Sequence, residues 1–349
     1  MNHLHLHSSG SLLDGAVDLE KAVLKTIENG GTGLALTDHA NMIKTFEFQQ
    51  VCDKHGVKPI IGCEFYVGDT KELKGYHLIV LAKNNVGLKN LFKLQKFSYM
   101  DNFYGKPKIN ESMLFALSEG LIVTTACIGS YFGKLFFNDD IIAIKNKLIQ
   151  YKEILGDDFY VEIQPNNIPE QRDYNLRMLG LANQLNIKYI VTCDAHYVNK
   201  EDAEAHDTLL AIQVKKKKQD TKRFKFTDDS FYMMNKEDIN NNLSGYIDHY
   251  TINRAIQNTY EIVNKCSAKY EEGYYPPTVG EDESAVLKQH CNEGYVKRYG
   301  NIYLQDEVER INYELNVICQ KNYAGYFLIV EDYIRFAKEQ GILVGPGRG

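Results

Sequence analysis

The chain of 349 residues carries 40 Lys and Arg residues against 46 Asp and Glu residues, a formal net charge of −6. Its mean hydropathy of −0.37 and its 44% hydrophobic residues are typical of a globular protein, and no run of about 18 apolar residues predicts a membrane span. The acidic balance does not indicate a general nucleic-acid-binding protein, although bound metal ions would add positive charge where carboxylates cluster.

Roughly the first 200 residues alternate between short β-rich runs and helical stretches. The predicted strands are His3–His7, Gly33–Thr37, Val57–Val67, Tyr76–Ala82, Leu121–Ala126, Asp158–Gln164 and Lys188–Thr192. The predicted helices between them are Val17–Asn29, Lys44–His55, Leu88–Tyr99, Glu111–Leu117, Ile141–Leu155 and Glu170–Leu185. Several strands are near-continuous apolar runs, typical of strands that helices cover on both faces. This alternation predicts an α/β domain with a parallel, barrel-like sheet.

Beyond this region the pattern becomes mainly helical. The predicted elements are helices at Glu201–Gln213, His249–Cys266, Val308–Gln320 and Tyr326–Gln340, with a short strand at Ser230–Met233. The segment Glu271–Glu283 is rich in Pro and Gly, so we expect one domain at 1–270 and a second at 271–349.

A basic run, Lys215 to Lys218, follows the first of these helices and is reinforced by Lys222, Arg223 and Lys225. A solvated surface loop is the simpler interpretation of this run. Contact with a phosphate backbone is the alternative.

Side chains that commonly bind metals recur at the ends of the predicted strands. His5 and His7 lie on one face of an extended strand because side chains alternate with period two, and Asp194 and His196 repeat this arrangement. The other candidates are Asp14, His39, Glu64, His77 and Cys127. The C-terminal ends of parallel barrel strands converge on one rim, where active sites lie. His77 fits less well, because it falls near the start of its apolar run; either that strand runs differently or its boundary lies elsewhere.

Nine candidates are more than one tetrahedral ion can use. Imidazole, thiolate and carboxylate ligands together favour Zn²⁺, Mn²⁺ or Fe²⁺ over Mg²⁺ or Ca²⁺. We therefore predict two or three divalent ions, bridged by Glu64 or an aspartate, which would polarise a phosphoryl group and activate water. Taken singly, Cys127 would more often be a small core residue, and Asp14 could cap the following helix. The remaining histidines, His55, His206, His249 and His290, are interpreted as core or surface residues.

Two features predict a cytoplasmic protein. The seven cysteines form no CxxC pair, which argues for reduced thiols rather than a disulfide framework. The N-terminus also lacks the basic region and the long apolar core of a secretory signal.

Several motifs resemble the PHP (polymerase and histidinol phosphatase) domain of bacterial DNA polymerase III α subunits. They are HLHLHSSGSLLDG (3–15), LTDHANM (36–42), IIGCEFYV (60–67), GYHLIVLAKN (75–84), TTACIGS (124–130) and TCDAHYV (192–198). The segment YFLIVEDYIRFAKEQGILVGPGRG (326–349) is similar to the opening of the polymerase palm in C-family replicative polymerases, which stand-alone PHP phosphatases lack. The resemblance covers essentially the whole chain. It implies a PHP-type distorted (β/α)7 barrel followed by a mainly helical partial palm segment.

The resemblance also implies roles for individual residues. Its metal ligands are His5, His7, Asp14, His39, Glu64, His77, Cys127, Asp194 and His196, all of the residue types that keep a PHP site metal-competent. It assigns one ion to His5, His7 and Asp194, a second to His77 and Cys127 with Glu64 as the bridge, and a third to Asp14, His39 and His196. It places Gly347, Arg348 and Gly349 at the triphosphate of an incoming nucleotide, which a Gly-rich loop can cradle through its backbone N–H groups.

In function, the resemblance implies the N-terminal part of a bacterial or phage replicative polymerase whose PHP domain is a metal-dependent 3′–5′ exonuclease. The implied partners are a DNA primer–template, the remainder of the polymerase chain, the sliding clamp and the clamp loader. Because the family's catalytic palm aspartates lie further along, we expect that this chain alone does not polymerise DNA. A non-catalytic scaffold domain stapled by metals is the alternative, and a small-molecule phosphatase is disfavoured by the palm-like segment.

Overall fold

A computed structural model of the chain describes residues 1–68, 74–273, 275, 277–302 and 304–347. These residues form two compact units, Met1–Tyr270 and Glu271–Gly349. The first unit is α/β and the second is helical. Within the described residues, no helix combines the length and the apolar composition that crossing a membrane requires.

The first unit is built around a six-stranded sheet with the strand order β1-β2-β3-β6-β7-β8. The strands are β1 (Gly33–Leu36), β2 (Lys58–Val67), β3 (Tyr76–Ala82), β6 (Leu121–Thr124), β7 (Phe159–Ile163) and β8 (Lys188–Val191). Neighbouring strands pair in parallel except at β3, which is antiparallel to both β2 and β6. The expectation of a wholly parallel sheet is therefore wrong at β3.

The N-terminal segment connects the two edges of this sheet. His3 bridges Leu34 of β1, and Leu6 bridges Ala195 just after β8, both in parallel. The backbone N–H of His7 donates to the carbonyl of Ala195 at 2.8 Å. The sheet thus curls into a distorted half-barrel, in which isolated bridges take the place of the strand expected at 3–7.

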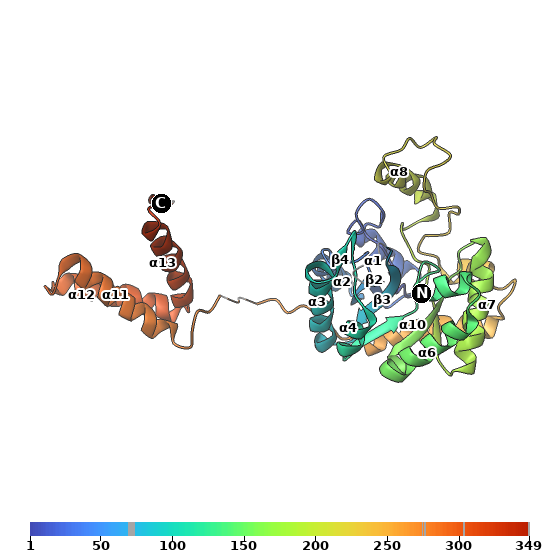
Figure 1. Ribbon diagram of the computed structural model, residues 1–349, viewed down its shortest axis with the longest axis horizontal. Coiled ribbons are helices and arrows are strands. Elements are labelled where there is room, and N and C mark those ends of the chain that lie inside the picture. Colours follow the sequence, from blue (N-terminus) through green and yellow to red (C-terminus); the bar gives the residue numbers. More distant parts are fainter. Residues whose placement is uncertain (69–73, 274, 276, 303, 348–349) are drawn as a thin grey trace. The chain divides into compact units, whose positions relative to one another are not determined.

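Helices surround the curled sheet (Figure 1). They are α1 (Leu19–Glu28), α2 (Thr45–His55), α3 (Asn85–Met100), α4 (Glu111–Ala116), α5 (Tyr131–Phe137), α6 (Ile141–Leu155), α7 (Pro169–Gln184), α9 (Lys236–Leu243) and α10 (His249–Lys265). Helix α8 (Ala203–Gln213) projects away from the sheet (Figure 1). A small hairpin, β4 (Phe103–Tyr104) and β5 (Lys106–Pro107), follows α3. Asp18, Asn84 and Asp140 start α1, α3 and α6 by accepting hydrogen bonds from backbone N–H groups of the first turn.

Sequence patterns missed some of these elements. Helices α5 and α9 are short and were not expected, and the strand predicted at Ser230–Met233 is wrong. Only Tyr232 of that segment forms an isolated bridge, with Tyr197. A single bridge supplies too few backbone hydrogen bonds to make a strand.

The second unit contains α11 (Glu283–Tyr299), α12 (Gln305–Gln320) and α13 (Ala324–Glu339). Its small core consists of Leu287, Leu315, Ala324 and Leu328, so the three helices bury little apolar surface among themselves. The helix α11 was not expected from the sequence. Gly347 lies in an exposed segment without regular structure, and Arg348 and Gly349 lie outside the described residues.

Candidate metal centre

The antiparallel direction of β3 explains the position of His77. Because β3 runs against its neighbours, its first residues lie at the rim where β2 and β6 end. His77 pairs with Tyr66 near the end of β2 and bridges Ser130, which follows β6. The apparent misfit of His77 in the sequence is therefore a consequence of strand direction.

His5 and His7 form the buried end of the centre with Asp194. The His5 Nε2 and His7 Nε2 atoms lie 3.1 Å apart. The Asp194 Oδ1 atom lies 3.0 Å from His5 Nε2 and 3.1 Å from His7 Nε2. Both imidazoles are fully buried, because they project from the N-terminal segment into the interior of the half-barrel. One carboxylate oxygen thus faces two imidazole nitrogens at a spacing that one cation between them would suit.

Glu64 on β2 lies at the middle of the centre. Its Oε1 atom is 3.2 Å from His5 Nε2 and 3.0 Å from His77 Nδ1. Its Oε2 atom is 2.5 Å from His39 Nδ1 and 3.7 Å from His7 Nε2. This buried carboxylate therefore reaches imidazoles that the resemblance assigns to all three ions, as a bridging ligand must.

The remaining candidates complete the rim. The Asp14 Oδ2 atom lies 3.0 Å from His39 Nε2, and the Cys127 Sγ atom lies 3.5 Å from His77 Nδ1. The His196 ring centroid is 4.4 Å from that of His7. The structure therefore brings all nine predicted side chains together.

Three sets of ligand atoms lie within 4.8 Å of one another: His5, His7 and Glu64; His39, Glu64 and His77; and His7, His39 and His196. These sets do not reproduce the grouping that the resemblance implies. The assignment of ligands to individual ions therefore stays a prediction.

Several buried oxygen atoms of this cluster have no hydrogen-bond partner among the described residues. They are Asp14 Oδ1, Glu64 Oε1, Glu64 Oε2 and Asp194 Oδ1. A buried carboxylate without a hydrogen bond or a counter-ion is energetically costly. A divalent cation would compensate these charges, so the donor set fits bound metal.

The pKa values reflect burial and close pairing. Burial, together with the neighbouring imidazoles, lowers the pKa of His7 to about 3, which leaves its ring neutral. Burial also disfavours the charged form of His39, but Glu64 and Asp14 outweigh it and raise its pKa to about 10. Although burial opposes its ionisation, Glu64 has a pKa well below its usual range because His77 and His39 stabilise the anion. In the absence of metal, the raised pKa values of His5 and His39 keep these two rings protonated beside the carboxylates, whereas His7 is neutral. A bound metal ion would replace these protons as the source of positive charge.

One carboxylate of the site was missed in the sequence. Glu162 on β7 is buried, and its Oε2 atom lies 3.1 Å from His5 Nδ1. It also accepts hydrogen bonds from the hydroxyls of Thr124 and Thr192. An imidazole that binds metal through one nitrogen usually donates the other to such a partner. Only the period-two alternation along β7, which turns Glu162 inward, could have indicated it.

A serine and an aspartate support His7 in a similar way. The Ser11 Oγ atom lies 3.2 Å from His7 Nδ1 and donates to Asp38 Oδ1 at 2.8 Å. Asp38 also accepts hydrogen bonds from the backbone N–H and hydroxyl of Ser8, both at 2.7 Å. Asp38 therefore fixes the loop after the N-terminal segment rather than pointing into the cluster.

His206 also lies close to the centre. This buried residue of α8 has its ring centroid 5.5 Å from that of His196. Burial, with a contribution from His196, lowers the pKa of His206 to about 4. His206 is therefore a neutral side chain that packs behind a candidate ligand, in agreement with its interpretation as a core residue.

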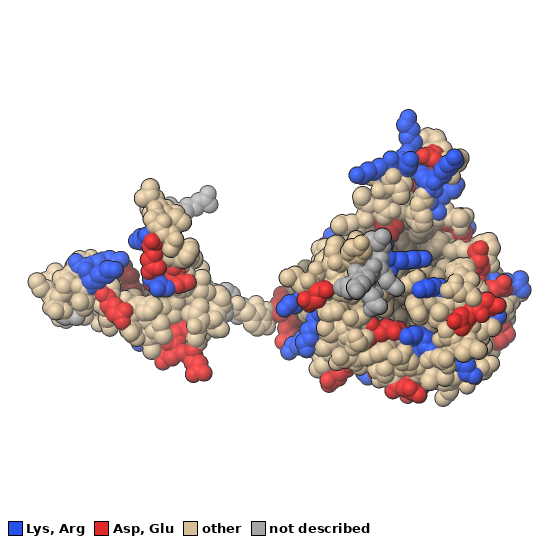
Figure 2. Space-filling model, in the orientation of Figure 1, with Lys and Arg blue, Asp and Glu red and all other residues tan. Residues whose placement is uncertain are grey.

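The basic run lies on a loop that follows α8. Figure 2 shows Lys and Arg side chains gathered over this part of the first unit. Several of them are paired: Lys218 with Glu204 at 2.9 Å, and Arg223 with Asp207 at 2.5 Å. These pairs neutralise part of the charge, and both interpretations of the run stay open.

Comparison with known proteins identifies the families that the chain matches. Residues 3–166 match the PHP domain family, and residues 285–349 match the family described as bacterial DNA polymerase III alpha NTPase domain. The DNA polymerase III subunit alpha of Borreliella burgdorferi is 37% identical, over 99% of this chain and 31% of the relative. The corresponding subunits of Treponema pallidum and Aquifex aeolicus are each 35% identical over 99% of this chain.

The coverage of these relatives is partial, because the alignment takes in 30% of the Treponema subunit and 32% of the Aquifex subunit. The chain thus spans about 31% of the length of the first curated relative. A solved amidohydrolase from Chromobacterium violaceum aligns with a TM-score of 0.39 and 13% identity, over 56% of this chain and 87% of that chain. The resemblance to DNA polymerase III alpha subunits is confirmed: the chain carries a PHP domain and a bacterial DNA polymerase III alpha domain, and it matches these subunits along 99% of its length.

Proposed function

We propose that this chain is the N-terminal part of a replicative DNA polymerase III alpha-type enzyme, and that its first unit is a metal-dependent 3′–5′ exonuclease acting on DNA. Residues 1–270 would be the PHP domain and residues 271–349 the start of the palm. The division of the chain into compact units after Tyr270 supports this boundary. A primer–template, the remaining polymerase chain, the sliding clamp and the clamp loader are the implied partners, in a bacterial cytoplasm.

The observation that carries the proposal is the convergence of the nine candidate ligands around buried carboxylate oxygens that lack hydrogen bonds among the described residues. Glu64 contributes two such oxygens and Asp194 one. Imidazole and thiolate donors beside these carboxylates favour Zn²⁺, Mn²⁺ or Fe²⁺. Two or three such ions would polarise a phosphoryl group and lower the pKa of a water molecule.

The residues of the chain set the direction from which a substrate approaches. The side chains of His5 and His7 are fully buried. Those of His77, Asp14 and His39 are 25%, 20% and 14% exposed, respectively. A phosphodiester therefore approaches from the side of His77 and Asp14, while His5 and His7 anchor the centre from within. The contact with Glu162 orients the His5 ring so that its Nε2 atom faces Glu64 and Asp194. The site is therefore arranged before the substrate binds.

The test is a metal count by mass spectrometry, combined on the same sample with an assay on a primer–template labelled at the 3′ end. We expect two or three ions per chain and stepwise shortening of the primer that stops in chelator. The variants His7→Ala and Asp194→Ala should lose both the metal and the cleavage. The control is His249→Ala, an exposed histidine at the start of α10, which should retain both.

Two other results would point to other functions. Bound metal with an intact primer, and unfolding that loses cooperativity on chelation, would identify a metal-stapled scaffold domain. Turnover of histidinol phosphate in preference to DNA would identify a small-molecule phosphatase. Cleavage that continues unchanged in Asp194→Ala would place the activity outside this centre.

A further inference from the structure

Lysine and tyrosine side chains line two adjoining hollows beside the metal centre. One hollow, of about 630 Å³, includes His77, Lys74 and Lys106 among its lining residues. The other, of about 220 Å³, shares Tyr76 and Lys134 with it and adds Tyr131. We name the surface formed by Lys74, Tyr76, Lys106, Tyr131 and Lys134 the Lys–Tyr groove. Because His77 lines it, the groove opens directly beside the candidate metal ligands.

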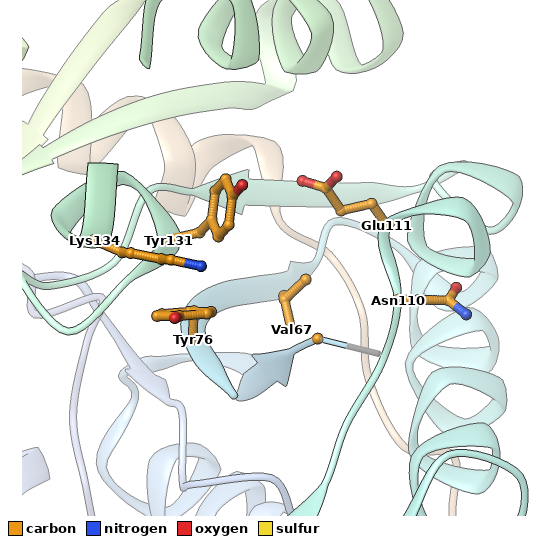
Figure 3. A pocket seen from close by; sticks show the side chains of 7 residues that line it. Val67, Tyr76, Asn110, Glu111, Tyr131 and Lys134 are labelled. Carbon is orange, nitrogen blue, oxygen red and sulfur yellow. The ribbon is translucent and has the colours of Figure 1, made fainter. Parts of the chain in front are cut away.

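The lysines of this groove lie over aromatic rings. The Lys134 Nζ atom is 4.8 Å from the ring centroid of Tyr76 and 5.3 Å from that of Tyr131. Figure 3 shows Lys134 extending its ammonium group between these two rings. The Lys74 Nζ atom is 5.4 Å from the Tyr76 ring centroid. Cationic groups and aromatic faces are therefore interleaved along the groove.

Tyr66 connects the groove to the metal centre. Its ring centroid lies 4.3 Å from the Lys106 Nζ atom. The same ring lies 5.3 Å from the His77 ring and 6.1 Å from the His39 ring. One tyrosine ring thus separates Lys106 from two candidate ligands, so an anion held by Lys106 would lie close to the metal ions.

The charge of the groove is positive, in contrast to the net charge of −6 of the whole chain. Among its described lining residues the carboxylate is that of Glu111. Glu111 accepts hydrogen bonds from Lys147 at 2.7 Å and from the Tyr151 hydroxyl at 3.0 Å. These partners offset its charge, so the exposed Lys74 and Lys106 contribute positive charge to the groove.

The adjacent hairpin extends the aromatic surface. Phe103 and Tyr104 of β4 are 55% and 49% exposed and precede Lys106 of β5 in the hairpin. Large aromatic side chains exposed beside cationic ones are typical of surfaces that bind single-stranded nucleic acids, in which unpaired bases stack on rings and phosphates contact lysines. Paired bases in a duplex have no free face to offer.

We propose that the Lys–Tyr groove binds the terminal nucleotides of a single-stranded nucleic acid and directs the 3′-terminal phosphodiester to the metal centre. The inference rests on the proposed function in one respect, namely that the centre hydrolyses phosphodiesters. It adds the surface of the chain that holds the 3′ end of the substrate. Lys74 and Lys106 contact phosphates, and the partly exposed ring of Tyr131, together with the exposed rings of Phe103 and Tyr104, faces the bases.

The experiment measures binding without cleavage. The 349-residue chain is titrated, in the presence of chelator, against a fluorescent oligodeoxythymidine with a free 3′ end, and anisotropy is followed at several salt concentrations. The double variant of Lys74→Gln and Lys106→Gln removes two exposed charges. Each lost phosphate contact with a single strand reduces the slope of log K against log salt by about 0.7. The slope of the double variant should therefore be smaller by about 1.4.

The stacking contribution and the control are tested in the same assay. Tyr131→Ala should weaken binding about 5- to 150-fold, and an abasic oligonucleotide should bind the unaltered chain more weakly to a similar degree. The control is Lys89→Gln. This exposed lysine lies near the start of α3, and α3 follows the end of β3 that is remote from the metal centre. Thermal unfolding of each variant shows that it is folded.

The outcomes separate this inference from the proposed function. Unchanged affinity and an unchanged salt slope in the double variant would overturn the binding role proposed for the Lys–Tyr groove, even if the chain cleaves DNA. Equal losses on a blunt duplex, or competition by thymidine monophosphate as strong as by the oligonucleotide, would also overturn it. A primer that stays intact with metal, while groove variants lose single-strand binding, would overturn only the exonuclease proposal.

Discussion

Glu162 offers a test of how the half-barrel prepares its metal ligands. Its carboxylate is buried and lies 3.1 Å from His5 Nδ1, and it accepts a hydrogen bond from the Thr192 hydroxyl at 2.5 Å. This contact directs the other nitrogen of His5, Nε2, toward Asp194 at 3.0 Å and Glu64 at 3.2 Å. Glu162→Gln keeps the shape of the side chain and removes its charge.

The expected cost follows from these contacts. Burial by itself would lower the pKa of His5, but Asp194 and Glu162 raise it well above its usual value, so Glu162 is one of two carboxylates that polarise the ring. Removing such a supporting partner usually lowers metal affinity about 10- to 100-fold. In free energy of binding this is about 1.4 to 2.7 kcal/mol. We expect a loss in this range for the tightest bound ion.

The assay is a competition titration of Zn²⁺ or Mn²⁺ against a chromophoric chelator, with the metal-free protein checked by circular dichroism. The matched control is Glu261→Gln on α10, whose carboxylate accepts hydrogen bonds from Lys188 at 2.6 Å and from the Tyr160 hydroxyl at 2.8 Å. Its metal affinity should equal that of the unaltered chain. Unaltered affinity in Glu162→Gln, or an equal loss in both variants, would refute the role assigned to Glu162.

Three further predictions concern the stability of the first unit. Gly87→Ala in α3 should be severely destabilising, because a Cβ atom there would lie 1.8 Å from the Gly120 carbonyl oxygen. In contrast, a Cβ atom at Gly180 in α7 meets open space, so Gly180→Ala should raise the free energy of unfolding by about 0.5–1 kcal/mol. Urea unfolding of both variants checks that the free energy of unfolding changes in opposite directions. A Gly87→Ala protein of normal stability would contradict this prediction. Phe48→Ala removes a fully buried ring and should cost about 3–5 kcal/mol in the same assay; a cost below about 1 kcal/mol would argue against this core. Asp140→Ala removes the side-chain cap of α6 and should cost about 1 kcal/mol, whereas Asp140→Asn should retain most of it.

Sequence patterns alone were sufficient for most regular elements of the first unit. The strand Tyr76–Ala82 and the helix Ile141–Leu155 have the bounds expected from their apolar periodicity. The pair His5 and His7 followed from the alternation of side chains in extended backbone. Local effects decide these features: apolar spacing sets the buried face, and capping residues set where a helix begins.

Helices α5 and α9 escaped this reasoning because they are short and begin at the caps Ser130 and Asn235 without a long apolar stripe. Helix α11 is long, but among its residues Leu287 and Tyr295 alone are buried, so its apolar periodicity is weak. The segment Ser230–Met233 has the composition of a strand, but its single bridge to Tyr197 leaves it irregular. Tertiary context overrides local preference in such segments.

The organisation of the metal centre depended on the tertiary structure. The sequence named the ligand types but left the direction of β3 open. The antiparallel direction of β3 places His77 beside Glu64 at the same rim. Alternation along β7 turns Glu162 inward but does not identify its partner, and its role appears only when the fold brings its carboxylate to 3.1 Å from His5 Nδ1. The sequence thus determined which chemistry the chain carries, because residue type fixes donor atoms and charge. Only the fold decided which donors meet, because strand direction and barrel closure join residues that lie far apart in the chain.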